Sequence, residues 1–366
     1  MHAASYSGKP RGVSIAAARG DIIPAIPMAL LTVRDLSVAF DTRDGLVRAV
    51  SGVSFSLDAG RVLALLGESG SGKSVTLRAL LGLHPAVRAR VDGEVLLKGR
   101  DVNRLDEAAR ERLRGGVVSM VFQEPMTALD PVYTIGEQIV ETLVQHRGLA
   151  RAAASSRARE LLDLVQVPSP ERCLASYPHE ISGGMRQRAM IAIALACEPE
   201  LLLADEPTTA LDVTVQAQIL WLLRDLQRRL GLAVIFVTHD LGVAAEIADE
   251  AAVMYAGRIV EQAPIRELFR RPAHPYTEGL MQATVRRGQK GKALIPIPGA
   301  PPNLIALPAG CAFAARCPIT KSVCVETLPM LHAVAADHVS RCHLVPERFT
   351  SPLVAAFDHG IQGGSS

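Results

Sequence analysis

The segment GESGSGKS, at residues 67–74, has the residue types and the spacing that hold phosphate groups. It follows an apolar run at 62–66, which predicts a buried strand, and precedes a predicted helix at 75–83. Glycines let backbone N–H groups converge on phosphate oxygens, and the helix start adds positive potential. We therefore predict a nucleotide-binding loop, with the lysine on the β- and γ-phosphates and the last serine on Mg²⁺. Its residues are Gly67, Glu68, Ser69, Gly70, Ser71, Gly72, Lys73 and Ser74.

A second segment, PELLLADEPTTALD, ends an apolar run with two adjacent carboxylates. Residues 201–204 predict another buried strand, and Asp205 and Glu206 follow it directly. Because α/β sheets bind ligands at the carboxyl ends of their strands, Asp205 is expected to coordinate Mg²⁺. Glu206 is expected to polarise the water that attacks the γ-phosphate. Alone, this pattern also fits a strand that runs into a loop, but the phosphate loop upstream favours the catalytic interpretation.

A third segment, ISGGMRQRAMIAIALAC, begins with Ser182, Gly183 and Gly184 before a predicted helix at 185–196. A helix cap would account for one small residue at this place, but not for a run of three. A helix start rich in free N–H groups is a typical anion site. We therefore predict a second place that contacts phosphate.

Together these segments resemble the ATP-binding subunits of ABC transporters. ISGGM is similar to the family signature LSGGQ, from which it differs at Ile181 and Met185. The resemblance implies an α/β P-loop fold with a RecA-like core, an antiparallel β subdomain and a helical subdomain. It also implies roles for four further residues: Gln123 of the Q-loop in catalysis, Mg²⁺ and ATP binding, Asp212 of the D-loop, His239 of the switch on the γ-phosphate, and Phe40 against adenine.

The chain is more closely similar to the ATP-binding subunits of bacterial dipeptide and oligopeptide importers. The similarity extends from about residue 30 to 346 and is carried by GESGSGKSVT, VFQEPMTALDPVYTIGEQI, YPHEISGGMRQR, HPYTEGLM and PGAPPNLIALPAGCAFAARCP. It implies an ATP-hydrolysing motor at the cytoplasmic face of the inner membrane. ATP would lie between Lys73 of one subunit and the Ser-Gly-Gly segment of a second ATP-binding subunit, and importers of this kind commonly pair two different ATP-binding chains as a heterodimer. The other implied partners are two transmembrane permeases and an extracytoplasmic peptide-binding protein.

The same evidence predicts four regions along the chain. We expect a disordered tail at 1–29, an ATPase domain at 30–265 whose helical subdomain covers about 125–196, a loop-rich C-terminal metal-binding domain at 266–348, and a tail at 349–366. Periodic structure begins just after Met28, so either Met1 or Met28 could be the initiator.

Four of the six cysteines are concentrated near the end of the chain, at Cys311, Cys317, Cys324 and Cys342. The first residues show no compact apolar core followed by a cleavage site, so we expect a cytosolic chain, and disulfides are rare in the cytosol. Four thiolates can hold a 4Fe-4S cluster or a tetrahedral Zn²⁺, and the spacing alone does not choose between them. Nearby histidines leave a mixed Cys/His zinc site open, and simple packing is a third possibility.

The family resemblance favours the 4Fe-4S cluster, because some similar importer subunits carry one on C-terminal cysteines. A structural and a redox-sensing role for it both remain open. The other two cysteines, Cys173 and Cys197, are predicted to be small buried hydrophobic residues.

Composition argues against two other classes of protein. A net charge of +2 is too balanced for nucleic acid to be the main partner. Residues 293–315 carry no charge, but their five prolines exclude a membrane-spanning helix. Two alternatives to the peptide importer stay open: a soluble ABC ATPase acting on nucleic acid or ribosomes, against which the balanced charge counts, and an importer subunit for another small solute such as nickel or glutathione.

Overall fold

The computed structural model describes residues 29–85, 87–209, 211–284 and 295–349. The tail expected at 1–29 therefore lies outside the described residues except for its last one. Most of the tail expected at 349–366 and both candidate initiator methionines lie outside them as well. Within the described ranges no helix combines the length and the apolar character needed to cross a bilayer.

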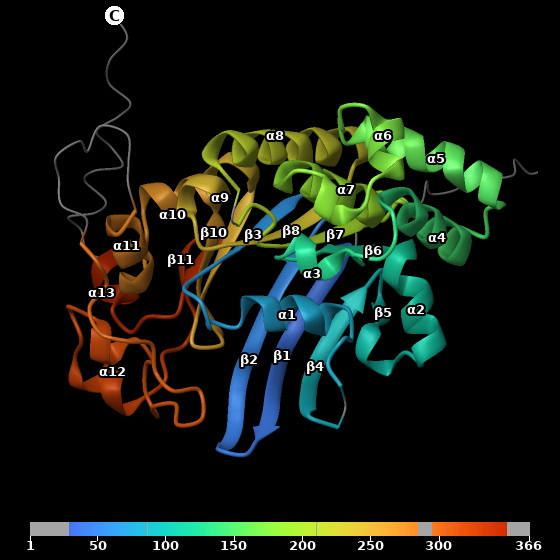
Figure 1. Ribbon diagram of the computed structural model, residues 1–366. Helices are drawn as coiled ribbons and strands as arrows, with labels where there is room; N and C mark the ends of the chain where they lie inside the picture. The colour runs from blue at the N-terminus through green and yellow to red at the C-terminus, as the bar shows by residue number, and fades with distance from the viewer. Residues whose placement is uncertain (1–28, 86, 210, 285–294, 350–366) are drawn as a thin grey trace, which may run out of the picture.

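A small antiparallel sheet lies near the start of the chain, as the family resemblance implied (Figure 1). Its strand order is β2-β1-β4-β5, and its strands are β1 (Leu31–Thr42), β2 (Gly45–Leu57), β4 (Ala89–Leu97) and β5 (Arg100–Asp101). Alternate side chains of β1, among them Leu31 and Val33, are buried. This period of two is typical of a sheet with one covered face.

The main sheet has the order β11-β12-β10-β9-β3-β8-β7-β6. Its five parallel strands are β3 (Val62–Leu66), β6 (Val118–Val121), β7 (Leu201–Asp205), β8 (Ala233–Thr238) and β9 (Glu250–Tyr255). Strand β3 lies in the middle, and its side chains alternate between two hydrophobic cores, one on each face. Burial on both faces explains the unbroken apolar run and confirms the two buried strands predicted from the sequence.

Helices cover both faces of the main sheet and form a lobe at one side of it (Figure 1). The helices next to the strands are α1 (Lys73–Leu80), α2 (Glu107–Gly116), α8 (Val213–Leu230) and α9 (Leu241–Ile247), with a short 3-10 turn at Val102–Arg104. The lobe contains α3 (Pro125–Ala128), α4 (Ile135–Arg147), α5 (Arg151–Leu164), α6 (Pro170–Ala175), a 3-10 turn at Pro178–Glu180, and α7 (Gly183–Leu195). These five helices fall within the range of 125–196 that we expected to be helical.

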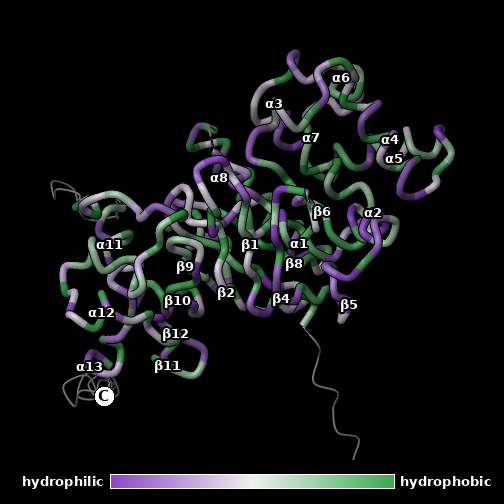
Figure 2. Tube along the Cα trace, turned by 90° about the horizontal axis from the view of Figure 1, so that it is seen from below, coloured by the Kyte–Doolittle hydropathy of each residue, from purple (hydrophilic) through white to green (hydrophobic). Residues whose placement is uncertain are grey.

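The C-terminal segment continues the main sheet. After β10 (Arg258–Pro264), it contains α10 (Ile265–Arg270), α11 (Pro275–Gln282), a 3-10 turn at Ala314–Arg316, α12 (Ser322–Glu326), β11 (His332–Ala335), β12 (His338–Ser340) and α13 (Val345–Phe349). Strand β12 pairs with β10, with Glu261 opposite Ser340. Figure 2 shows α11–α13 on the opposite side of the strands from the lobe α3–α7.

A buried carboxylate joins this segment to the sheet. Glu261 of β10 is fully buried and accepts hydrogen bonds from the backbone N–H groups of Ala273 (2.6 Å) and His274 (2.9 Å). Its Oε1 also lies 2.7 Å from Nε2 of His338 on β12. One side chain therefore ties together β10, the start of α11 and the last strand pair.

We predict that Glu261→Ala destabilises the protein, because it leaves two buried N–H donors and an imidazole without their acceptor. The expected loss in the free energy of unfolding is about 3 kcal/mol, measured by denaturant unfolding. Glu261→Gln is the matched control: it keeps an acceptor and should lose less. Equal stability of the alanine variant and the wild type would contradict this assignment.

Candidate functional site

The phosphate loop connects β3 to α1, and two of its glycines have no room for a side chain. Gly67 and Gly72 have φ angles of 148° and 105°, which side chains with a Cβ rarely adopt. A Cβ on Gly72 would also lie 2.5 Å from the carbonyl oxygen of Ala49, and one on Gly67 would collide with that of Met254. The loop is therefore closely packed from both sides.

Lys73 begins α1, and its ammonium group points back into the loop. Nζ donates to the carbonyl oxygens of Gly67 (2.8 Å) and Glu68 (2.9 Å). Burial lowers the pKa of Lys73, and the carboxylates of Glu206, Asp205 and Glu68 oppose that shift. A buried ammonium group held beside a glycine-rich loop at a helix start is what a polyphosphate site requires.

Ser74 and Asp205 are in direct contact although they are far apart in the sequence. Ser74 Oγ donates to Asp205 Oδ1 at 2.8 Å, and Asp205 is the last residue of β7. Burial raises the pKa of Asp205, and the hydrogen bond from Ser74 opposes the rise. A hydroxyl beside a buried carboxylate provides the hard oxygen ligands that Mg²⁺ prefers, so these two residues fit the predicted magnesium ion.

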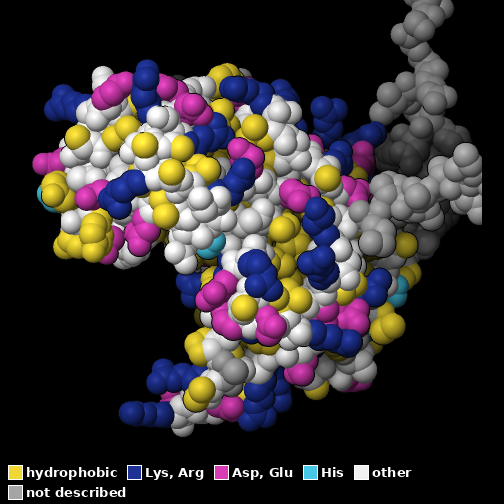
Figure 3. Space-filling view, turned by 90° about the vertical axis from the view of Figure 1, so that its right-hand side faces the viewer, with side chains coloured by type: hydrophobic (Ala, Val, Ile, Leu, Met, Phe, Trp, Pro, Cys, Tyr) yellow, Lys and Arg dark blue, Asp and Glu magenta, His cyan; other side chains and the backbone are white. Residues whose placement is uncertain are grey.

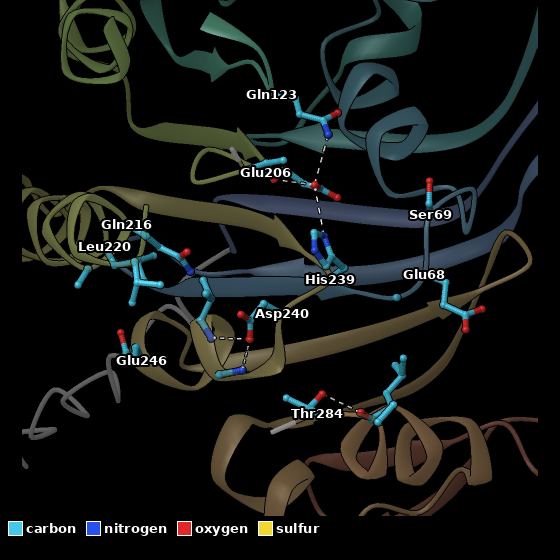
Figure 4. A pocket seen from close by; sticks show the side chains of 18 residues that line it. Glu68, Ser69, Gln123, Glu206, Gln216, Leu220, His239, Asp240, Glu246 and Thr284 are labelled. Carbon is cyan, nitrogen blue, oxygen red and sulfur yellow. Dashed lines mark hydrogen bonds and ion pairs between the residues drawn. The ribbon is translucent and has the colours of Figure 1, made fainter. Parts of the chain in front are cut away.

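Three predicted residues from three different strands meet at Glu206 (Figure 4). Glu206 Oε2 accepts from Gln123 Nε2 at 3.3 Å and lies 3.4 Å from His239 Nδ1. Gln123 follows β6, Glu206 follows β7 and His239 follows β8, so the parallel strands bring them together. The structure adds Thr209, whose Oγ1 donates to the same carboxylate oxygen at 2.8 Å.

Thr209 was missed by the sequence analysis. The only signal for it is its position three residues after Glu206 in EPTT, and a threonine at that spacing often only stabilises a turn. Glu206 itself has a φ of 46°, an uncommon conformation for a residue with a side chain. Backbone strain of this kind is concentrated at functional sites.

A large open cavity, about 1030 Å³, faces these groups. The loop residues Gly67, Glu68 and Ser69 line it on one side, and Gln123, Glu206 and His239 line it on another. Residues of α8, of α9, and of the end of α11 and the turn just after it complete the wall, as Figure 4 shows for Gln216, Glu246 and Thr284. The cavity thus combines the start of the phosphate loop with a carboxylate that could activate water. Lys73, Ser74 and Asp205 do not line it, and Asp205 instead lines a second cavity together with Gln123.

The Ser-Gly-Gly segment is not part of this cavity. Ser182 caps α7 by accepting from Met185 N–H at 3.3 Å, and Gly183 and Gly184 form the first turn of that helix. Asp212 caps α8 in the same way, accepting from Val215 N–H at 3.0 Å. None of the three signature residues belongs to the cavity wall.

Phe40 lies on β1, and its ring packs edge-on against His84 with the ring centroids 5.3 Å apart. Burial lowers the pKa of His84, and a hydrogen bond to the Val75 carbonyl opposes that shift. Phe40 is half-buried and therefore has a partly open face. It does not line the large cavity.

The four C-terminal cysteines surround one small cavity, together with His274 and Phe313. Burial raises the pKa of Cys311 to about 11 and also raises the pKa of Cys317 and of Cys342. Within the described residues, however, no group of three or more His, Cys, Asp or Glu side chains is arranged to hold a metal ion. The metal-binding part of the predicted fold is therefore not found. Cys173 and Cys197 are buried in the hydrophobic core, as predicted.

His274 adds a further feature to the cysteine cavity. Its Nδ1 accepts from Tyr276 N–H at 3.1 Å, so a proton on the neutral ring is carried by Nε2. Burial lowers the pKa of His274 to about 4, which keeps the ring neutral. The Arg341 carbonyl approaches the ring and partly opposes that shift, but Nε2 makes no hydrogen bond of normal geometry. A buried donor is thus left without a good acceptor beside the four thiols.

Comparison with known proteins agrees with this geometry. Residues 50–209 match the family described as ABC transporter, and residues 260–324 match the family described as oligopeptide/dipeptide transporter, C-terminal region. The dipeptide transport ATP-binding protein DppD of Bacillus subtilis is 48% identical over 87% of this chain and 96% of its own length. The chain belongs to the ABC transporter ATP-binding proteins.

Further relatives of this family extend the comparison. The oligopeptide transport ATP-binding protein OppD of Salmonella typhimurium is 48% identical over 86% of this chain and 93% of its own length. Among solved structures, a dimeric ATP-binding cassette in a post-hydrolysis state with ADP and Pi is similar with a TM-score of 0.58 and 29% identity. The similarity covers 64% of this chain and 99% of that one. This ABC transporter ATPase thus shares its nucleotide-binding fold with cassettes that dimerise.

Proposed function

We propose that this chain is the ATP-hydrolysing motor subunit of a peptide importer. The observation that carries the proposal is one cavity in which the start of the phosphate loop, residues 67–69, faces Gln123, Glu206 and His239. Relatives named for dipeptide and oligopeptide transport, matched over most of their length, support the peptide substrate. Over the described part of the face drawn in Figure 3, acidic and basic side chains are interspersed, which offers no track for a nucleic-acid backbone.

In this proposal the phosphate loop binds ATP and Lys73 neutralises the β- and γ-phosphates. Ser74, Asp205 and Gln123 hold Mg²⁺, which would supply charge neutralisation at the phosphates. Glu206 takes a proton from the attacking water, and His239 contacts the γ-phosphate. The aromatic ring of Phe40 contacts adenine.

The proposed active unit contains two ATP-binding chains, in which the Ser-Gly-Gly helix start of each completes the site of the other. The dimeric cassettes among the similar solved structures support this arrangement. In the importer, residues 30–265 act as the ATPase and 266–348 as an accessory region. The chain would work at the cytoplasmic face of the inner membrane, below two permeases that receive peptide from an external binding protein.

We predict that Glu206→Gln retains ATP affinity but slows hydrolysis by about 10²–10⁴-fold, the usual contribution of a general base. The amide keeps the hydrogen bonds of the site but cannot accept a proton from water. ATP hydrolysis is measured by phosphate release, and binding is measured by titration calorimetry. Turnover within a few-fold of the wild type would remove Glu206 from this role.

A second prediction separates nucleotide binding from assembly of the two-chain site. Lys73→Ala should abolish tight ATP binding by this chain, because it removes the cation from the loop. Ser182→Arg should leave that binding intact and reduce hydrolysis, because it blocks the helix start that faces the partner's ATP. ATP binding by the isolated chain and hydrolysis by the assembled complex are compared for both variants. Loss of this chain's own ATP binding in Ser182→Arg would contradict the two-chain arrangement.

We further propose that Cys311, Cys317, Cys324 and Cys342 hold a 4Fe-4S cluster with a structural role, with Zn²⁺ as the alternative. Two observations support a bound group: all four thiols line one cavity, and the Nε2 of His274 lacks a good acceptor there. A cluster is larger than a single ion and holds its thiolates further apart. The absence of a single-ion ligand arrangement among the described residues therefore weighs more against zinc than against a cluster.

If the cluster is present, anaerobically purified protein should be brown, with broad absorbance near ~400 nm and about four irons per chain. Replacing any one of the four cysteines by serine should remove the colour. Cys173→Ser and Cys197→Ser are the matched controls and should keep it. Colourless protein with one equivalent of zinc would favour the zinc alternative. Metal-free protein whose C-terminal segment fully resists proteolysis would contradict both the cluster and the zinc ion.

A further inference from the structure

The C-terminal segment contacts the phosphate loop directly, through Arg316 and Glu68. Arg316 Nη1 lies 2.7 Å from Glu68 Oε2, and Nη2 lies 3.0 Å from Glu68 Oε1. The two parallel bonds form the bidentate geometry that is strongest for arginine and a carboxylate. Glu68 is the second residue of the loop, so this pair connects the loop to a residue 248 positions away.

The surroundings of Arg316 are built for a guanidinium group. The residue is 6% exposed, and all five of its N–H donors have acceptors. Besides the two bonds to Glu68, Nε donates to the Pro298 carbonyl (2.9 Å), Nη1 to Tyr255 OH (3.3 Å) and Nη2 to the Ile297 carbonyl (3.4 Å). A lysine could not reproduce this fork, because its ammonium offers three donors from a single point.

Glu68 is held at its backbone as well as at its side chain. Its N–H donates to the hydroxyl of Tyr276, a fully buried residue of α11, at 2.8 Å. Its carbonyl oxygen accepts from Lys73 Nζ at 2.9 Å. The C-terminal segment therefore holds two polar groups of Glu68, while the third bonds to the lysine expected to bind phosphate.

Residues next to Arg316 in the chain also line the cysteine cavity. Arg316 directly precedes Cys317, and Phe313, which lines that cavity, packs edge-on against Tyr255 with centroids 5.3 Å apart. The rings of Phe313 and Tyr276 are also in contact, at 5.4 Å. One short turn and a small aromatic cluster thus lie between the thiols and the phosphate loop.

We propose that Arg316 is a positioning residue for the phosphate loop, so that ATP affinity depends on the folded C-terminal segment. Arg316 does not touch the nucleotide. It fixes the position of Glu68, and with it the Glu68 carbonyl oxygen that accepts a hydrogen bond from Lys73 Nζ. The proposal relies on ATP binding at the phosphate loop and does not require a metal group at the cysteines.

The test measures ATP affinity and turnover of the full chain after the ion pair is broken from either side. Arg316→Gln should weaken Mg·ATP binding about 10-fold. A loss of this size is within the range found for substitutions at residues that affect binding without touching the ligand. The turnover number at saturating ATP should stay within about 3-fold, because the groups around Glu206 are unchanged. Glu68→Gln changes the loop and leaves the sequence of the buried C-terminal segment unaltered, and it should weaken Mg·ATP binding by a similar factor. The double variant should bind Mg·ATP no more weakly than either single variant.

Arg341→Gln is the matched control. Arg341 lies in the same segment and bonds to the carbonyls of Ile259 and Pro329, but it does not contact the phosphate loop. Its substitution should leave ATP affinity unchanged. An equal loss in Arg341→Gln, additive effects of the two single changes, or affinity within 2-fold of the wild type in Glu68→Gln would each overturn the proposal. A wild-type chain that does not bind ATP would instead overturn the proposed function.

Discussion

Two backbone carbonyls press against the phosphate loop, and the arrangement of the nucleotide site depends on that close approach. The carbonyl of Met254 excludes a side chain at Gly67, and the carbonyl of Ala49 excludes one at Gly72. Met254 belongs to the main sheet and Ala49 to the smaller one. The loop is thus held at the junction of two sheets, and the start of α1 contacts the carboxyl end of β7 through Ser74 and Asp205.

Much of the candidate site could be predicted because its signals are local. The strands before the loop and before Asp205 are continuous apolar runs, and parallel strands bring their carboxyl ends together. Contact between Ser74 and Asp205 follows from that topology once the two motifs are recognised. The positions of Gln123 and His239 could be stated only through the family resemblance, since a single glutamine or histidine after a strand has no specific pattern of its own.

The features that could not be predicted depend on long-range contacts without periodicity. Arg316 lies in a Pro- and Gly-rich stretch, and nothing in that stretch indicates Glu68 as its partner. Strand β12 is three residues long, which is too short for an alternating pattern. Its pairing with β10 could therefore not be predicted from the sequence. The metal-binding region was predicted from four cysteines, and cysteine spacing reports which thiols exist but not how far apart folding places them.

The pairing of β12 with β10 also affects the exposed edge of the main sheet. An unpaired edge strand offers a row of free N–H and C=O groups to any other chain, which is a route to aggregation. Here β10 is covered by β12, and the outermost strand, β11, has only four residues. A minimal cassette cut after 265 would expose β10 as a new edge of seven residues. The accessory segment therefore closes an edge that would otherwise be open to pairing with another chain, in addition to contacting the phosphate loop.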